Sequence, residues 1–309
     1  MSLGRTILAL DAARWRQLAL ITGVSVLLYA GFRALPTGTN LHPVDFSAPG
    51  KGMVDYCDPA NPQFIPVAKV RSPVAMTLSG DAPTESGRDA RYRLVLKTST
   101  GKPVGPVDLL VSHTRKLHLL IADPTLRDYQ HIHPEAGARP GEWTFAFTPR
   151  LAGTYRVFAD FTPVATARSL YAVAELPVKG EVAVNTHGLS LEAVVEGYRF
   201  RLAPAVMPIT ARQVADLTFT VTRDDGGRVA MEPVMGAFAH LVAFDAALGG
   251  FAHLHPKETD LSKPPDAMRP ALTFKITIPT GGRYVVWAQV KLAGREIFAP
   301  FWFEVAPAF

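Results

Sequence analysis

The sequence predicts an all-β protein, in which two tandem immunoglobulin-like Greek-key β-sandwiches follow one N-terminal transmembrane helix. Three observations support this fold class. One segment occurs twice, short alternating apolar runs are separated by turn residues, and one long uncharged stretch lies near the N-terminus. The 26 prolines and 24 glycines among the 309 residues fall between the alternating runs, which is typical of turns in all-β proteins.

Residues 17–35 are predicted to form the transmembrane helix. The run QLALITGVSVLLYAGF within this range carries no charge and is flanked by Arg16 and Arg33. At about 1.5 Å per residue this run is short for a bilayer core of roughly 30 Å, but snorkelling arginines and Trp15 can extend it.

Residues 1–16 are predicted to lie in the cytoplasm. They contain three arginines and one aspartate, so the positive-inside bias sends the rest of the chain outward. The expected location is therefore the bacterial inner membrane, with both β-domains in the periplasm. A cleaved signal peptide has similar basic and apolar regions, so that alternative is left open by the sequence.

A Pro-rich periplasmic tether is expected at residues 36–63, because proline and glycine interrupt every helical or strand pattern there. It contains Cys57, the single cysteine of the chain, so no intramolecular disulfide can form. An inert thiol, an intermolecular disulfide and a metal ligand all remain open for Cys57.

The repeat predicts two sandwich domains, at residues 64–178 and 180–309, joined by a short hinge. Residues 118–134, HLLIADPTLRDYQHIHP, return as residues 240–256, HLVAFDAALGGFAHLHP. In both copies thirteen positions separate the first histidine from the second. Repetition at this scale indicates two copies of one fold, and each domain has an ordinary size.

Seven short strands are expected in each sandwich. In the first sandwich they are 68–77, 91–97, 107–112, 117–121, 142–147, 154–161 and 170–176. In the second they are 189–195, 198–204, 217–221, 241–244, 272–278, 283–290 and 296–305. A Gly-x-Tyr segment begins one strand in each copy, and we expect Tyr155 and Tyr284 to hydrogen-bond back to the chain as tyrosine corners.

The repeated histidines are candidate metal ligands. Alternation along an extended segment places His131 and His133 on one side, with Cβ atoms about 7 Å apart. A hairpin return would bring His118 close, and three imidazoles suit copper or zinc. The full candidate set is His118, His131, His133, His240, His253 and His255.

Two other roles for these histidines remain open, namely hydrogen bonding within a sandwich corner and contact with a partner. His113 stands five residues before the first copy, where Met235 stands five residues before the second. Histidine and methionine are both copper ligands, but methionine is also an ordinary core residue.

These segments, over about residues 105–163 and 231–292, resemble a group of poorly characterised bacterial membrane-anchored periplasmic proteins. Their tandem immunoglobulin-like domains carry His-x-His-Pro motifs, and the resemblance extends distantly to periplasmic copper-handling immunoglobulin-like domains. By analogy, this resemblance implies metal handling. The second copy lacks Asp128, because Gly250 stands there, so any role of Asp128 would not be shared.

The sequence favours a non-catalytic protein. It contains no Gly-x-Ser-x-Gly, His-Glu-x-x-His, phosphate-binding loop or dinucleotide fingerprint. The net charge of +5 comes from dispersed residues, so no nucleic-acid partner is expected.

The first functional hypothesis is a single-pass periplasmic accessory or scaffolding subunit of a larger bacterial membrane complex, of photosynthetic or respiratory type. Its partners would be integral membrane subunits and, through the N-terminal helix, the lipid bilayer. The expected interaction residues are Trp15, Tyr29, Phe32, Phe46 and Tyr56. The alternative is a periplasmic protein that binds or delivers copper or zinc through the duplicated histidines.

Overall fold

The structure, a computed structural model, describes residues 11–34, 39–46, 63–81, 83–182 and 187–308. The chain divides into two compact units, Met1–Asn40 and Leu41–Phe309. The first unit contains α1 (Ala12–Ala34). Its span Ala12–Phe32 is long and apolar enough to cross a membrane, and a signal sequence would meet the same criteria. The predicted N-terminal helix is therefore present, as an anchor or a signal helix.

The second unit begins with a β-sandwich whose two sheets have the orders β1-β2-β6-β5 and β4-β3-β7-β8. Its strands are β1 (Val74–Gly80), β2 (Ala90–Thr98), β3 (Leu117–Ala122), β4 (Tyr129–Ile132), β5 (Glu135–Ala136), β6 (Glu142–Phe147), β7 (Gly153–Phe161) and β8 (Leu170–Val178). The chain changes sheets from β2 to β3, from β4 to β5 and from β6 to β7, so this is an immunoglobulin-like Greek key.

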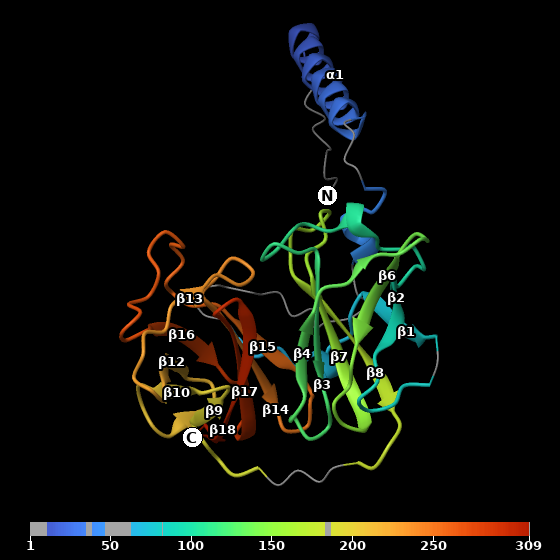
Figure 1. Cartoon of the computed structure of the whole chain (residues 1–309). Coiled ribbons are helices and arrows are strands. Elements are labelled where there is room, and N and C mark those ends of the chain that lie inside the picture. Colours follow the sequence, from blue (N-terminus) through green and yellow to red (C-terminus); the bar gives the residue numbers. More distant parts are fainter. Residues whose placement is uncertain (1–10, 35–38, 47–62, 82, 183–186, 309) are drawn as a thin grey trace, which may run out of the picture. The chain divides into compact units, whose positions relative to one another are not determined.

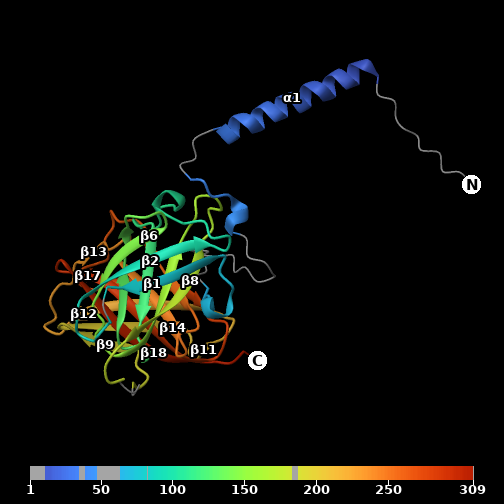
Figure 2. The same ribbon diagram turned by 90° about the vertical axis from the view of Figure 1, so that its right-hand side faces the viewer.

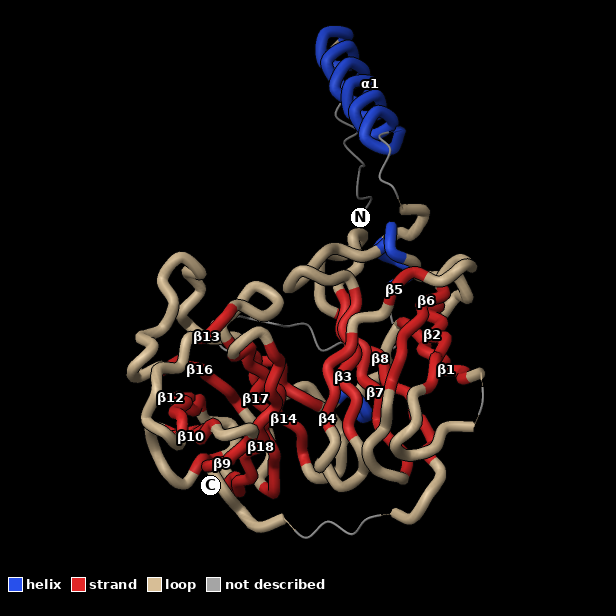
Figure 3. Tube along the Cα trace, viewed as in Figure 1, coloured by secondary structure: helices blue, strands red, loops and turns tan. Residues whose placement is uncertain are grey.

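The second sandwich repeats this arrangement with the sheets β16-β12-β10-β9 and β11-β18-β17-β14-β15, and β13 pairs with β17. Its strands are β9 (Glu192–Val195), β10 (Tyr198–Pro204), β11 (Ile209–Thr210), β12 (Val214–Arg223), β13 (Met231–Glu232), β14 (Ala239–Asp245), β15 (Phe251–Leu254), β16 (Ala271–Thr277), β17 (Gly282–Leu292) and β18 (Arg295–Ala306). Figure 3 shows that strands form nearly all of its regular structure.

The two sandwiches pack together through β4-β3-β7-β8 of the first and β15-β14-β17-β18 of the second (Figure 1). Each sandwich has its own apolar core, and a third core, the interface core, lies between them. Aromatic rings make up much of the interface core. The ring centroid of Phe244 lies 5.5 Å from that of Tyr129 and 5.9 Å from that of Phe158, both of the other sandwich. Because β3 and β14 are covered on both faces, their residues are buried almost without interruption.

Part of the expected tether, from Leu41 on, and the residues that follow it belong to this second unit. Within the described residues, 3-10 helices lie at Pro43–Phe46, Val67–Lys69 and Pro106–Asp108. Leu41 and Phe46 enter the first sandwich core, and Phe64 enters the second. Ile65 exchanges two backbone hydrogen bonds with Phe251, at 2.8 and 3.1 Å.

Several sequence-based expectations are confirmed. The Leu151 amide donates a hydrogen bond to the Tyr155 hydroxyl at 3.0 Å, and Tyr284 donates to the carbonyl of Thr280 at 3.0 Å, so both tyrosine corners are present. In Figure 2 the outer sheet of the first sandwich, with β1 and β2, lies nearest the viewer.

Other expectations differ from the structure. The strand expected at 107–112 is a 3-10 helix followed by isolated bridges. The short strands β4 and β15 were not predicted, although each carries one of the candidate histidines. The first sandwich ends with β8 at Val178, as expected, but in the described residues the next strand begins at Glu192, so the connection is longer than the short hinge expected.

Candidate metal centre

The six candidate histidines form two triads. Centre 1 consists of His118, His131 and His133, and centre 2 consists of His240, His253 and His255. Within each triad one ring nitrogen from every histidine lies within 4.8 Å of the other two.

Strand pairing produces this convergence. His118 lies on β3, and the β3–β4 hairpin pairs Leu120 with His131, so both imidazoles reach the same face. His133 follows the end of β4. In the second copy the β14–β15 hairpin places His253 opposite Val242 in the same way.

The nitrogens in centre 1 are close together. His118 Nδ1 lies 3.1 Å from His131 Nε2 and 3.2 Å from His133 Nε2. Ligands about 2.0–2.1 Å from a tetrahedral zinc ion are about 3.3–3.4 Å apart, so little rearrangement is needed to hold a metal. In centre 2, His240 Nδ1 lies 3.2 Å from His253 Nε2.

Hydrogen bonds outside centre 1 determine which nitrogens carry hydrogen. His118 Nε2 lies 2.9 Å from the carbonyl of Ser112 and must donate to it, which leaves Nδ1 as a lone pair. Gln289 donates through Nε2 to Glu296 at 2.7 Å, so its Oε1 faces His131 Nδ1 at 2.9 Å. His131 therefore donates through Nδ1 and also presents a lone pair, on Nε2, to the centre.

Centre 2 has the same arrangement. His240 Nε2 donates to the carbonyl of Val234 at 3.0 Å, so its Nδ1 is a lone pair. His253 Nδ1 faces the carboxylate of Asp160 at 3.5 Å, a longer contact than that between His131 and Gln289, and Nε2 faces the centre. His255 Nε2 is buried without a hydrogen-bond partner in the described residues.

Facing lone pairs repel one another unless a cation lies between them. A proton is disfavoured, because burial is the largest cause that lowers the pKa of all six imidazoles. The pKa of His133 falls to about 3 and that of His240 to about 4. Neutral imidazoles are the form that binds metal, and outer partners of this kind usually orient metal-binding histidines.

The two centres lie side by side at one edge of the sandwich interface. The His131 and His253 rings are 5.5 Å apart between centroids. His113, from the first sandwich, stacks on His255 at 3.8 Å. Seven of the nine histidines of the chain therefore gather in one cluster, and the partners of His131 and His253 each come from the opposite sandwich.

Sequence reasoning found the six histidines but missed Gln289 and Asp160. Both lie on the strand that follows a tyrosine corner, at equivalent positions of the repeat. Polar residues in otherwise apolar, buried strands were the available signal.

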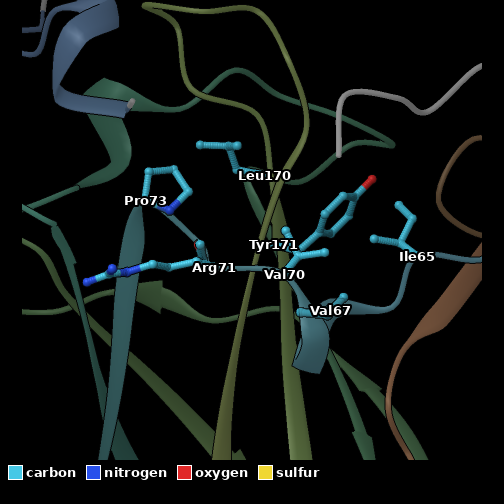
Figure 4. Close-up of a pocket in the computed structure, with 8 residues that line it drawn as sticks. Ile65, Val67, Val70, Arg71, Pro73, Leu170 and Tyr171 are labelled. Atoms are coloured by element: carbon cyan, nitrogen blue, oxygen red, sulfur yellow. The ribbon is translucent and has the colours of Figure 1, made fainter. Parts of the chain in front are cut away.

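An open groove borders one member of centre 1. It has a volume of about 530 Å³ and is lined by His133 together with polar residues that include Asp81, Arg93 and Glu135. It gives solvent a route to the half-buried His133. The apolar pocket beneath Tyr171, with Arg71 pointing away from it (Figure 4), has only about 20 Å³. That space holds roughly one water molecule, so it is not a ligand site.

The expected interaction residues have different outcomes. Trp15, Tyr29 and Phe32 are exposed on α1. Phe46 is 2% exposed and packs in the first sandwich core, so the expectation that it forms a partner-binding surface is wrong. Tyr56 lies outside the described residues, as does Cys57.

Asp128 has a structural role. It is fully buried and accepts hydrogen bonds from the Tyr155 hydroxyl at 2.8 Å and the Arg150 amide at 2.7 Å. Its counterpart must be Gly250, because a Cβ atom there would clash with the carbonyl of Ile65. The difference between the repeats at this position therefore reflects packing of the tether.

Comparison with known proteins follows the repeat. The family model described as a domain of unknown function (DUF8832) matches residues 68–176 and 193–307. The chain belongs to this family. The DUF8832 match covers both sandwiches, including all six histidines of the two centres.

No curated protein matches the chain. Among solved structures, the Escherichia coli adhesin FdeC matches 75% of this chain with 14% sequence identity and a TM-score of 0.22. The match covers 64% of the FdeC chain. At this TM-score the likeness carries no argument. Neither the family match nor the structural match shows a relationship between this chain and copper-handling domains.

Proposed function

We propose that this protein is a non-catalytic, membrane-anchored metal-binding protein that holds copper or zinc in two three-histidine centres between its sandwiches. The observation that carries the proposal is the convergence of imidazole lone pairs, in which His118 and His131 of centre 1 and His240 and His253 of centre 2 direct their other nitrogens at outer partners. Structural histidines would direct N–H groups toward acceptors in the same cluster. Here the nearest neighbour of His118 Nδ1 is the lone pair of His131 Nε2.

The type of ligand atom limits which metal ions the two centres can bind. Three imidazoles without a thiolate or a directly bound carboxylate suit Zn²⁺ or copper and disfavour Ca²⁺ and Mg²⁺, which prefer oxygen ligands. Three protein ligands also leave one position of a tetrahedral ion free. Such a position lets a metal be handed to another protein, which fits a carrier better than a closed structural site.

The cellular placement is part of the proposal. α1 would anchor the chain in the bacterial inner membrane with residues 1–16 in the cytoplasm, and both sandwiches would lie in the periplasm. The exposed aromatic residues of α1 suit contact with lipid. The accessory-subunit hypothesis stays a prediction, because these side chains would suit a membrane partner equally well.

The test is metal analysis of the full-length protein purified in mild detergent, after equilibrium dialysis against Zn²⁺ or Cu²⁺. We expect two metal ions per chain. The variants H131A and H253A should each lose one ion, whereas H42A, which removes an exposed histidine outside both centres, should lose none. Failure of the wild-type protein to bind either ion would contradict the proposal. Fixed-ratio co-purification with integral membrane subunits and no metal would instead support the accessory-subunit hypothesis.

A further inference from the structure

The two centres differ in the groups that the opposite sandwich supplies. In the repeat, Asp160 and Gln289 are equivalent, because Asp160 pairs with His118 and Gln289 pairs with His240. Each of them reaches across the interface instead of supporting its own triad. Centre 2 therefore has a carboxylate beside His253, and centre 1 has a neutral amide beside His131.

A second difference lies in the turns that precede β3 and β14. His113 and Met235 occupy the same left-handed position of the repeat, with φ of 47° and 48°. The two turns are neighbours, since a Cβ atom on Gly236 would lie 3.9 Å from Thr114. His113 stacks on His255 of centre 2.

His113 is also close to the other members of centre 2. Its ring centroid lies 5.9 Å from that of His253 and 6.1 Å from that of His240. The His113 ring therefore lies beside all three imidazoles of centre 2. The equivalent position in the second copy holds Met235, whose thioether is a softer ligand than an imidazole.

Both differences should strengthen the binding of a divalent ion at centre 2. A carboxylate that accepts the N–H of a metal-bound imidazole raises the basicity of that ligand and offsets the positive charge of the ion. Asp160 has a side chain only 15% exposed, so solvent screens this interaction weakly. Gln289 fixes the orientation of its imidazole without supplying charge.

Resting on the function proposed above, we propose that centre 2 is the high-affinity site for a divalent metal ion, because the first sandwich supplies it with Asp160 and His113. Centre 1, with the neutral Gln289 in the equivalent place, binds the same ion about 10- to 100-fold more weakly, which is the size of effect that changes in outer partners usually have.

The experiment uses single-site forms of the full-length protein. H131A retains centre 2 and H253A retains centre 1. Each is titrated with Zn²⁺ against a chromophoric chelator. We expect H131A to bind Zn²⁺ at least tenfold more tightly than H253A.

The substitution D160N then identifies the cause. It keeps the size of the side chain and removes its charge, and it should weaken Zn²⁺ binding about 10- to 100-fold in the H131A background. In the H253A background it should change binding less than threefold, so the second background is the matched control. H113M, which copies the second turn into the first, should also weaken only centre 2.

Thermal melts of the metal-free variants confirm that each is folded before it is titrated. Equal affinities of H131A and H253A would overturn the inference, as would an equal effect of D160N in both backgrounds. Absence of Zn²⁺ and Cu²⁺ binding by the wild-type protein is a different result, which refutes the proposed function itself.

Discussion

Replacement of Phe244 by alanine tests whether docking of the sandwiches supports the metal centres. The Phe244 side chain is fully buried in the interface core, where it contacts Tyr129 and Phe158 of the other sandwich. It is not part of the second sandwich's own core. F244A should therefore weaken the interface while each sandwich keeps its internal packing.

The expected loss is about 3–5 kcal/mol in the free energy of unfolding, as for other buried phenylalanines. Because His131 depends on Gln289 and His253 depends on Asp160 across this interface, Zn²⁺ binding should fall at both centres, by about tenfold or more. Urea unfolding of the metal-free protein and Zn²⁺ titration measure the two effects.

The matched control is F200A. Phe200 is also fully buried, but it lies inside the second sandwich core and stacks on Phe219 at 6.0 Å. It should cost a similar free energy of unfolding and leave Zn²⁺ affinity nearly unchanged. Equal Zn²⁺ affinity in F244A and F200A, at comparable losses of stability, would refute the coupling between docking and metal binding.

Two further outcomes are expected. G250A should displace Ile65 and lower the free energy of unfolding by about 2 kcal/mol, because two backbone hydrogen bonds at roughly 1 kcal/mol each are lost. Urea unfolding measures this loss. The control G188A should show none, because a Cβ atom there meets no other atom within 4 Å. Unchanged stability of G250A would mean that the backbone contact between Ile65 and Phe251 does not stabilise the fold. The metal-free protein should lose stability as the pH falls from 6.5 toward 4. Burial lowers the pKa of His240 to about 4 in the folded protein. In this pH range His240 of the unfolded chain takes up a proton that His240 of the folded protein does not accept, so unfolding becomes more favourable. His240 alone contributes about 1.4 kcal/mol per pH unit in this window, and equal urea midpoints at pH 7 and pH 5 would contradict the assignment.

The repeat made the sandwiches and the histidines predictable, because apolar alternation and a thirteen-residue histidine spacing are local properties of the sequence. The four-residue strands β4 and β15 were missed for a physical reason. Each follows a tight turn and ends at the motif His-x-His-Pro, so it is too short for a clear period. Its extended conformation is stabilised by pairing with β3 or β14.

The interface was harder to predict than either fold. The nearly continuous burial of β3 and β14 corresponds to the apolar runs LHLLIA and AHLVAFD, which indicate strands covered on both faces. No local feature of the sequence identifies the surface that covers the outer face of β3 or of β14. The crossing partners Gln289 and Asp160 therefore could not be assigned to histidines more than ninety positions away, because that pairing depends on how the sandwiches dock.

Metal binding and docking are linked in both directions. An ion that binds only the docked form stabilises it by about 2.7 kcal/mol at a concentration of 100 times its dissociation constant. Two filled centres would then contribute about 5 kcal/mol, which is comparable to the 3–5 kcal/mol expected from Phe244. By reciprocity, any contact that loosens the interface lowers the affinity of the centres by the same free energy. A partner that separates the sandwiches would consequently weaken metal binding at both centres without contacting a ligand.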